Sequence, residues 1–128
     1  MINIQLLTKQ YGQFVAADAI SFDVQAGEVF GLLGPNGAGK STTINCLSGL
    51  LQATSGDISI DGHPMVGDGL DAKKSLGLVP QELALYEDLT AHENLIFWGQ
   101  AYGLSGDALN KRMQTVLEQV GLTDRQKD

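Results

Sequence analysis

The feature that most constrains this chain is an octapeptide that reads G-x-x-x-x-G-K-S, formed by residues 34–41. It lies between an apolar run at 29–33 and a helix-compatible stretch that begins at Thr42. In a strand, loop and helix joined in this way, successive backbone N–H groups converge on an anion, and the helix dipole adds positive potential there. The pattern predicts a cradle for the phosphates of a nucleotide, and its setting disfavours a glycine-rich turn without a ligand.

Each residue type in the octapeptide has a physical role in such a cradle. Glycines keep Cβ atoms out of the way, so the backbone can approach the phosphates. The Lys40 ammonium would reach the β- and γ-phosphates, and the Ser41 hydroxyl would complete the shell of a Mg²⁺ ion that bridges their oxygens. The predicted nucleotide-binding residues in this region are Gly34, Pro35, Asn36, Gly37, Ala38, Gly39, Lys40, Ser41 and Thr42.

Hydrophobic periodicity predicts strands in the first part of the chain. Segments 4–9 and 19–24 alternate, or nearly alternate, which predicts antiparallel strands with one wet face. Segment 29–33 is apolar on both faces, as a central strand of a parallel sheet needs. A short strand at 56–62 and an apolar strand at 76–80 complete the prediction for this region.

Helical patterns follow the cradle and fill the last part of the chain. A helix is predicted over 42–50, where the single cysteine, Cys46, is expected to be a small packing residue. The segment 90–93, with Thr first and Glu last, has the form of a capping box, which predicts a helix over 91–102.

A further helix is predicted from about Ser105, because a single apolar stripe runs along its surface and Gly121 follows as a plausible stop. The stripe consists of Leu109, Met113, Val116, Leu117 and Val120.

Size and charge restrict the possible partners. The chain has 128 residues, one domain or part of one, and a formal net charge of −7 without any Lys/Arg-rich cluster. Bulk charge therefore argues against nucleic acid or an anionic membrane surface as a partner. The lone cysteine, the absence of a signal-peptide pattern at the start, and the absence of any apolar run near ~18 residues predict a cytosolic chain without a membrane span.

Several segments resemble the ATPases of ATP-binding-cassette (ABC) transporters, in the same order along the chain. The octapeptide, with the two threonines after it, closely resembles their Walker A motif. LTKQYG at 7–12 resembles their A-loop, and VPQE at 79–82 resembles their Q-loop. The passage 47–62 resembles the stretch after Walker A, and LTAHENL at 89–95 is similar to the helical-subdomain entry of bacterial efflux-type members.

The resemblance implies roles for two further residues. Tyr11 matches the A-loop aromatic that stacks on adenine, a contact worth about 1–3 kcal/mol by analogy with base stacking; the alternative is a strand-end aromatic in a small core. Gln81 matches the Q-loop glutamine, whose neutral amide touches Mg²⁺ or the attacking water; the alternative is an ordinary polar residue at a strand end. The resemblance thus implies ATP and Mg²⁺ as cofactors, Lys40 and Gln81 as catalytic residues, and Ser41 and Gln81 as Mg²⁺ contacts.

Other polar residues are predicted to have structural roles. Glu93 is explained by capping. His92 falls in the first turn of the helix it begins, and His63 falls in a turn, so neither has the partners of a metal site. The acidic pair at 87–88 is predicted to lie in a solvated loop, because the run before it is too short for a buried strand.

Three parts of the family's hydrolytic machinery do not occur in residues 1–128: a Walker B strand ending in Asp-Glu, the signature Leu-Ser-Gly-Gly-Gln, and a switch histidine. Segment 104–107 imitates only the first letters of the signature, and its place suggests a helix N-cap. We therefore expect the N-terminal part of one ABC nucleotide-binding domain. Its α/β fold would comprise a P-loop NTPase core with an antiparallel β-subdomain at about 1–85 and the start of the helical subdomain at about 86–128, with Walker B and later strands absent.

The function that the resemblance implies is that of an ATP-binding subunit of an ABC exporter, with ATP hydrolysis coupled to transport. It implies two partners, a second nucleotide-binding domain and a membrane permease, which would hold the protein at the inner face of the cell membrane. The resemblance implies an ATP hydrolase by family, whereas residues 1–128 alone are expected not to be competent for hydrolysis. The alternative is a non-catalytic nucleotide-binding fragment, which downstream sequence would distinguish. A P-loop GTPase would need Asn-Lys-x-Asp, and the Asn-Lys at 110–111 lacks the Asp.

Overall fold

A computed structural model describes residues 1–82 and 84–125 of the chain. The chain forms two compact units, one over Met1–Leu78 and the other from Val79 onward. Residues 126–128, at the end of the predicted helical part, lie outside the described residues. Each unit is described by itself.

An antiparallel hairpin opens the first unit. Strands β1 (Ile2–Tyr11) and β2 (Phe14–Val24) pair from Ile2 opposite Val24 to Tyr11 opposite Phe14. Gly12 takes a φ of 58° at the tight turn between them, a conformation that favours glycine. The two strands predicted from alternation are confirmed, and both are longer than predicted.

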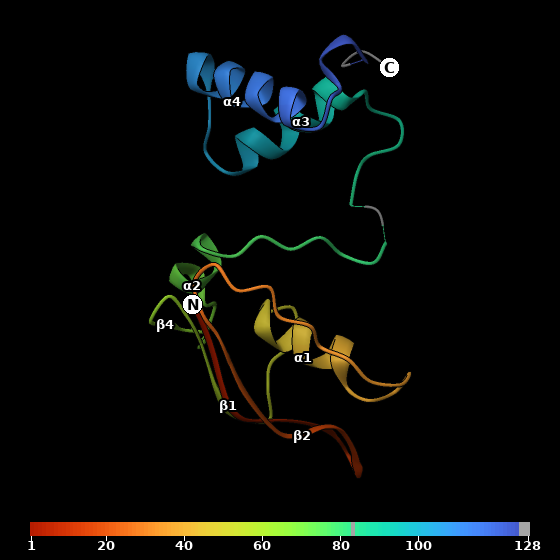
Figure 1. Cartoon of the computed structure of the whole chain (residues 1–128), viewed down its shortest axis with the longest axis vertical. Coiled ribbons are helices and arrows are strands. Elements are labelled where there is room, and N and C mark those ends of the chain that lie inside the picture. The colour runs from red at the N-terminus through yellow and green to blue at the C-terminus, as the bar shows by residue number, and fades with distance from the viewer. Residues whose placement is uncertain (83, 126–128) are drawn as a thin grey trace. The chain divides into compact units, whose positions relative to one another are not determined.

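The hairpin belongs to a four-stranded sheet (Figure 1). Strand β3 (Ser55–Ile60) pairs antiparallel with β1, and the short β4 (His63–Pro64) pairs with β3, which gives the order β2-β1-β3-β4. The predicted strand near 56–62 is therefore confirmed as β3, and its last two predicted residues form the turn into β4.

Two helices complete the first unit, α1 (Lys40–Leu47) and α2 (Leu70–Lys74). Their buried faces meet the sheet in one core, which consists of Ile4, Leu7, Cys46, Leu47, Ile58, Ile60 and Ala72. Cys46 is 1% exposed, so the predicted packing role is confirmed. Helix α1 ends before its predicted limit at residue 50, because Gly49 has a φ of 69° and terminates the helical path.

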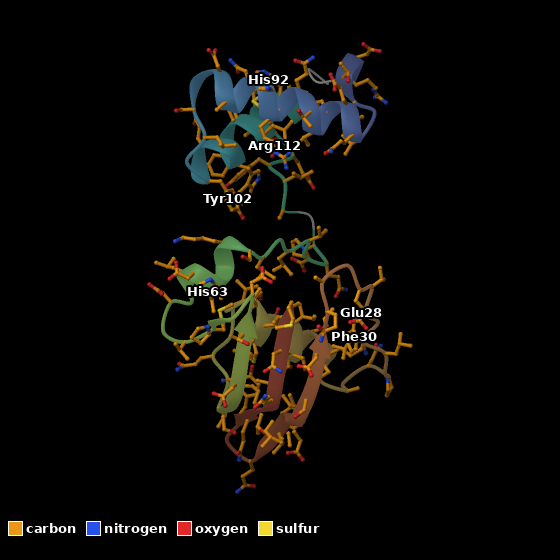
Figure 2. The ribbon with its side chains drawn as sticks, turned by 60° about the vertical axis from the view of Figure 1, so that its left-hand side comes forward. Glu28, Phe30, His63, His92, Tyr102 and Arg112 are labelled. Atoms are coloured by element: carbon orange, nitrogen blue, oxygen red, sulfur yellow. The ribbon has the colours of Figure 1, made fainter. Side chains whose placement is uncertain are left out.

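The two apolar runs predicted as strands, 29–33 and 76–80, form no strand. The prediction failed because a parallel strand exists only where neighbouring strands accept and donate its backbone hydrogen bonds. The four strands of the described chain are all antiparallel, and none pairs with either run. Phe30 instead stacks on Phe22 of β2, with ring centroids 4.7 Å apart (Figure 2).

The second unit contains the helix pair α3 (Ala91–Ala101) and α4 (Gly106–Gln119), followed by a single 3₁₀ turn, η1 (Thr123–Arg125). The predicted capping box is confirmed: the Glu93 N–H donates to the Thr90 hydroxyl oxygen, and the Glu93 carboxylate accepts the Thr90 N–H at 2.9 Å. Ser105 is the N-cap residue of α4, as predicted, although its side chain makes no capping hydrogen bond.

The apolar stripe of α4 is only partly buried. Leu109, Met113 and Leu117 pack inside the unit, whereas Val120 is 60% exposed. Val120 lies beyond the last helical residue, and Gly121 follows with a φ of 68°, so the stripe stops one residue short of its predicted end.

Candidate nucleotide-binding site

The first six residues of the octapeptide, 34–39, form a loop, and its last two residues begin α1. Gly37 and Gly39 have φ values of 85° and 82°, which an L side chain rarely adopts. The loop closes on itself through a hydrogen bond of 3.2 Å from the Ala38 N–H to the Pro35 carbonyl. The backbone thus turns sharply around residues 35–39, as the sequence pattern predicts for a phosphate cradle.

Gly39 fixes the loop against β2. A Cβ atom built at Gly39 would lie 2.4 Å from the Ala16 carbonyl oxygen, closer than real Cβ atoms approach an oxygen. Gly39 is also the N-cap residue of α1. Glycine is therefore required here both by the backbone conformation and by the close contact with the neighbouring strand.

Lys40 is the first residue of α1, and its side chain bends back over the loop. Its Nζ atom donates to the Gly34 and Pro35 carbonyl oxygens, both at 2.7 Å. An ammonium group has three donors, so two hold the side chain and one remains for a further acceptor. The positive charge of Lys40 is thereby held next to residues 34 and 35 of the loop.

The start of α1 favours an anion. The first N–H groups of any α-helix lack intrahelical partners, and the N-cap of α1 offers no side chain to satisfy them. The Gly39 carbonyl accepts two hydrogen bonds from Thr43, from its N–H at 2.8 Å and from its hydroxyl at 2.9 Å. The helix dipole and the Lys40 charge therefore act on the same place, which suits a polyphosphate.

The two residues between Lys40 and Thr43 differ in exposure. Ser41 is exposed, whereas Thr42 is half-buried. An exposed hydroxyl in the first helical turn is a hard oxygen ligand that suits Mg²⁺ at a phosphate. The residues present therefore fit Mg·ATP, with Ser41 as the predicted metal contact.

Tyr11 lies at the end of β1, and its residue is 49% exposed. The Lys9 Nζ atom lies over its ring, 4.9 Å from the centroid. The same Nζ donates to the Gln52 carbonyl, 2.8 Å away, in the segment that follows α1. The Tyr11 ring is thus accessible. Lys9 contacts both this ring and the segment that follows α1.

Gln81 lies in the second unit, in an exposed bend, and Ser41 lies in the first. The structure describes the two units separately, so the shared contact of Ser41 and Gln81 with Mg²⁺ stays a prediction. The segment at 84–86 forms no strand, and the acidic pair at 87–88 lies exposed in a turn, in agreement with the predicted solvated loop.

The two histidines are not part of the cradle. His63 belongs to β4 of the first unit, and His92 belongs to α3 of the second (Figure 2). No cluster of three or more metal-ligating side chains occurs among the described residues. In the same part of the chain, none of the helices has the length and apolar character needed to cross a membrane.

Sequence reasoning overlooked two residues that the structure singles out, Lys9 and Asn94. A two-residue spacing on a strand places side chains on one face, so Lys9 beside Tyr11 could have been predicted from the A-loop segment. Asn94 gave no such signal. It is 6% exposed and bonds to the loop before α3, an interaction that depends on how that loop folds back.

Comparison with known proteins places these features in a family. The sequence profile described as "ABC transporter" matches residues 17–128. The linearmycin resistance ATP-binding protein of Bacillus subtilis is 52% identical over 128 residues, which are 100% of this chain and 41% of that protein. A probable multidrug ABC transporter ATP-binding protein of Escherichia coli is 43% identical over 122 residues, 95% of this chain and 21% of that protein. The chain thus spans less than half the length of these relatives.

Two solved structures have a fold similar to that of this chain. An ATP-binding subunit of an ABC transporter matches with a TM-score of 0.84 and 32% identity, covering 100% of this chain and 53% of that one. The cbiO1 protein of Clostridium perfringens, described as part of the ABC transporter complex cbiONQ, matches with a TM-score of 0.84 and 26% identity, covering 99% of this chain and 53% of that one.

Proposed function

This chain belongs to the ABC transporter family, and we propose that it is the ATP-binding part of a transporter that couples Mg·ATP binding and hydrolysis to export of a substrate. The predicted fold class is confirmed: it is an α/β chain with an antiparallel sheet, as in the N-terminal part of ABC ATP-binding subunits. The geometry of the loop supports the assignments at residues 34–42, whereas the roles of Tyr11 and Gln81 rest on their resemblance to the A-loop and the Q-loop.

The observation that carries the proposal is the position of Lys40. Its ammonium is held by two loop carbonyls at the uncapped start of α1, where the glycine backbone leaves room for an anion. Charge-assisted hydrogen bonds to phosphate are among the strong interactions in proteins. Lys40 therefore binds the β- and γ-phosphates, and residues 34–42 surround them.

Bound Mg²⁺ supplies charge neutralisation on the phosphate oxygens during phosphoryl transfer. In this chain, the Ser41 hydroxyl is the proposed ligand within the cradle, and Gln81 is the proposed contact from the second unit. Tyr11 stacks on the adenine, which distinguishes ATP from a bare polyphosphate. Lys40 and Gln81 are the proposed catalytic residues.

The names of the relatives support a role in export. They describe proteins of linearmycin resistance and multidrug transport, and other relatives are Nod factor export ATP-binding proteins at about 40% identity. We place this protein at the inner face of the cell membrane, bound to a permease and paired with a second nucleotide-binding domain. We propose that the pocket for the transported substrate lies in the permease.

The test of the proposal is the affinity of Lys40→Ala for Mg·ATP, measured by calorimetry in the purified protein. We expect a loss of about ten-fold or more, because a hydrogen bond to a charged group is worth about 1.5–3 kcal/mol. Lys111→Ala removes an equal charge from an exposed position of α4 and should leave the affinity unchanged. Unchanged affinity in a folded Lys40→Ala protein would refute the site.

Hydrolysis and transport need a second measurement. Because residues 1–128 contain neither a Walker B strand nor a signature segment, phosphate release from ATP is measured in a chain extended by the downstream coding sequence, alone and in membranes that contain its permease. The export proposal predicts turnover that the permease stimulates and that Lys40→Ala abolishes. Tight Mg·ATP binding without phosphate release under both conditions would instead support the non-catalytic nucleotide-binding alternative.

A further inference from the structure

Lys9 contacts the exposed ring at the edge of the proposed nucleotide site. From this contact we infer that Lys9 is a positioning residue, which orients Tyr11 for stacking on the base of the nucleotide. The inference rests on the proposed function and adds to it a residue that acts only through Tyr11.

The end of β1 needs such an anchor, because its pairing is irregular. The β1–β2 register shifts between Leu7 and Lys9 and again between Lys9 and Gln10. Regular ladder hydrogen bonds therefore do not by themselves determine where the last residues of β1 lie. Tyr11 is the final residue of the strand, and its one cross-strand partner on β2 is Phe14.

A segment that follows α1 supplies the missing contacts. The Lys9 ammonium donates to the Gln52 carbonyl at 2.8 Å. The Thr54 N–H donates to the Thr8 carbonyl at 2.9 Å, and its hydroxyl accepts the Gln10 N–H at 3.0 Å. Three hydrogen bonds thus connect residues 8–10 to the segment that follows α1. The segment after α1 is therefore bonded to the end of β1 that carries Tyr11, and α1 itself begins at Lys40 of the proposed phosphate loop.

The contacts of Lys9 support an interaction between its ammonium charge and the Tyr11 ring. Among the described residues, no carboxylate forms an ion pair with Lys9. Its ammonium is held by one carbonyl and by the Tyr11 ring, within the distance at which a cation is attracted to an aromatic face. Because the cation covers one face of the ring, the base stacks on the opposite face.

The experiment is a double-mutant cycle between Lys9→Met and Tyr11→Ala in the purified protein. Methionine keeps an unbranched apolar stem and removes the charge, and Lys9→Gln serves as a second neutral variant. Lys9→Arg retains a cation, and Lys74→Met removes a charge from an exposed lysine paired with Asp71. The affinities for Mg·ATP and for Mg·tripolyphosphate are measured by calorimetry, and thermal unfolding shows that each variant is folded.

We expect Tyr11→Ala to weaken ATP by about five-fold or more and Lys9→Met or Lys9→Gln to weaken it by about two- to five-fold. Tripolyphosphate binding should be unchanged in these three variants. Lys9→Arg should retain the ATP affinity of the parent protein, and Lys74→Met should leave it unchanged. In the Tyr11→Ala background, Lys9→Met should cause no further loss.

Two results would overturn the inference while leaving the nucleotide site intact. One is an equal loss for ATP and tripolyphosphate in Lys9→Met, which would mean that its charge acts on the phosphates. The other is an undiminished effect of Lys9→Met in the Tyr11→Ala background. If Tyr11→Ala itself leaves the preference for ATP over tripolyphosphate unchanged, the adenine contact of the proposed function fails, and the role of Lys9 fails with it.

Discussion

Gly39 lies so close to Ala16 that a Cβ atom at Gly39 would be 2.4 Å from the Ala16 carbonyl oxygen. The last glycine before Lys40 therefore joins the phosphate loop to the hairpin that carries Tyr11. Gly37 offers a comparison within the same loop. Its φ of 85° is almost that of Gly39, but a Cβ there would meet nothing within 4 Å.

Gly39→Ala is expected to destabilise the first unit more than Gly37→Ala. Both substitutions introduce the strain of a left-handed conformation, about 1–2 kcal/mol. Only Gly39→Ala also forces a side chain into the Ala16 backbone, which adds about 1–3 kcal/mol. Urea unfolding of the two variants and the parent protein measures the difference. Equal losses would show that the contact with β2 is unimportant for stability.

Asn94→Ala is expected to destabilise the second unit by about 1–3 kcal/mol, since it leaves partly buried backbone groups without their Asn94 partner. The Asn94 carbonyl oxygen accepts the Tyr86 N–H at 2.9 Å, and its amide donates to the carbonyls of Tyr86, Leu89 and Thr90. The loss would occur although alanine is the better helix former.

Fluorescence of the single tryptophan, Trp98, reports on this unfolding, because its ring lies 6.4 Å from that of Tyr86. Asn110→Ala is the control, as Asn110 is exposed on α4 and should change stability by less than about 0.5 kcal/mol. If the two variants are equally stable, the Asn94 contacts do not hold the loop to α3.

The N-terminus of α3 is expected to weaken in acid. The Thr90 N–H, and then the Thr90 hydroxyl, hold the pKa of the Glu93 carboxyl below its ordinary value. A lowered folded-state pKa contributes stability above the unfolded-state pKa, and that contribution is lost as the pH falls through the folded-state value. The protection factors of the amides at residues 90–93, which compare the observed exchange rate with the intrinsic rate at the same pH, should therefore fall below the ordinary pKa of glutamate.

Glu93→Gln provides the comparison for this effect, because its amide oxygen can still accept the Thr90 N–H but does not titrate. The protection factors at the helix start should no longer fall in acid in this variant. An identical acid response in both proteins would assign the effect to other carboxylates.

Cys46 should react slowly with iodoacetamide in the folded protein, because it is 1% exposed and burial raises the pKa of its thiol. We expect alkylation to be faster in urea by a factor of about 100 or more, since a core helix opens only at a free energy close to that of global unfolding. Mass spectrometry of the labelled protein at both conditions measures the ratio. Similar rates would mean that α1 opens without global unfolding.

Local sequence patterns determined a large part of this structure. The hairpin strands, the capping box at Thr90 and the helical stripe around Leu109 each depend on residues near one another in the chain. The G-x-x-x-x-G-K-S octapeptide also carries its own conformational requirements, because its glycines and its lysine act on the backbone of the same loop.

Tertiary structure alone decided the features that join distant segments. Apolar composition at 29–33 and 76–80 was compatible with a strand, but strand formation depends on hydrogen bonds to other segments, which no local pattern specifies. The approach of Gly39 to Ala16 and the bond from Lys9 to Gln52 likewise join residues far apart in the sequence. The sequence by itself therefore determined that a sharply turned glycine-rich loop leads into α1. The packing of that loop against β2 and of α1 against the sheet decided which side chains lie near it.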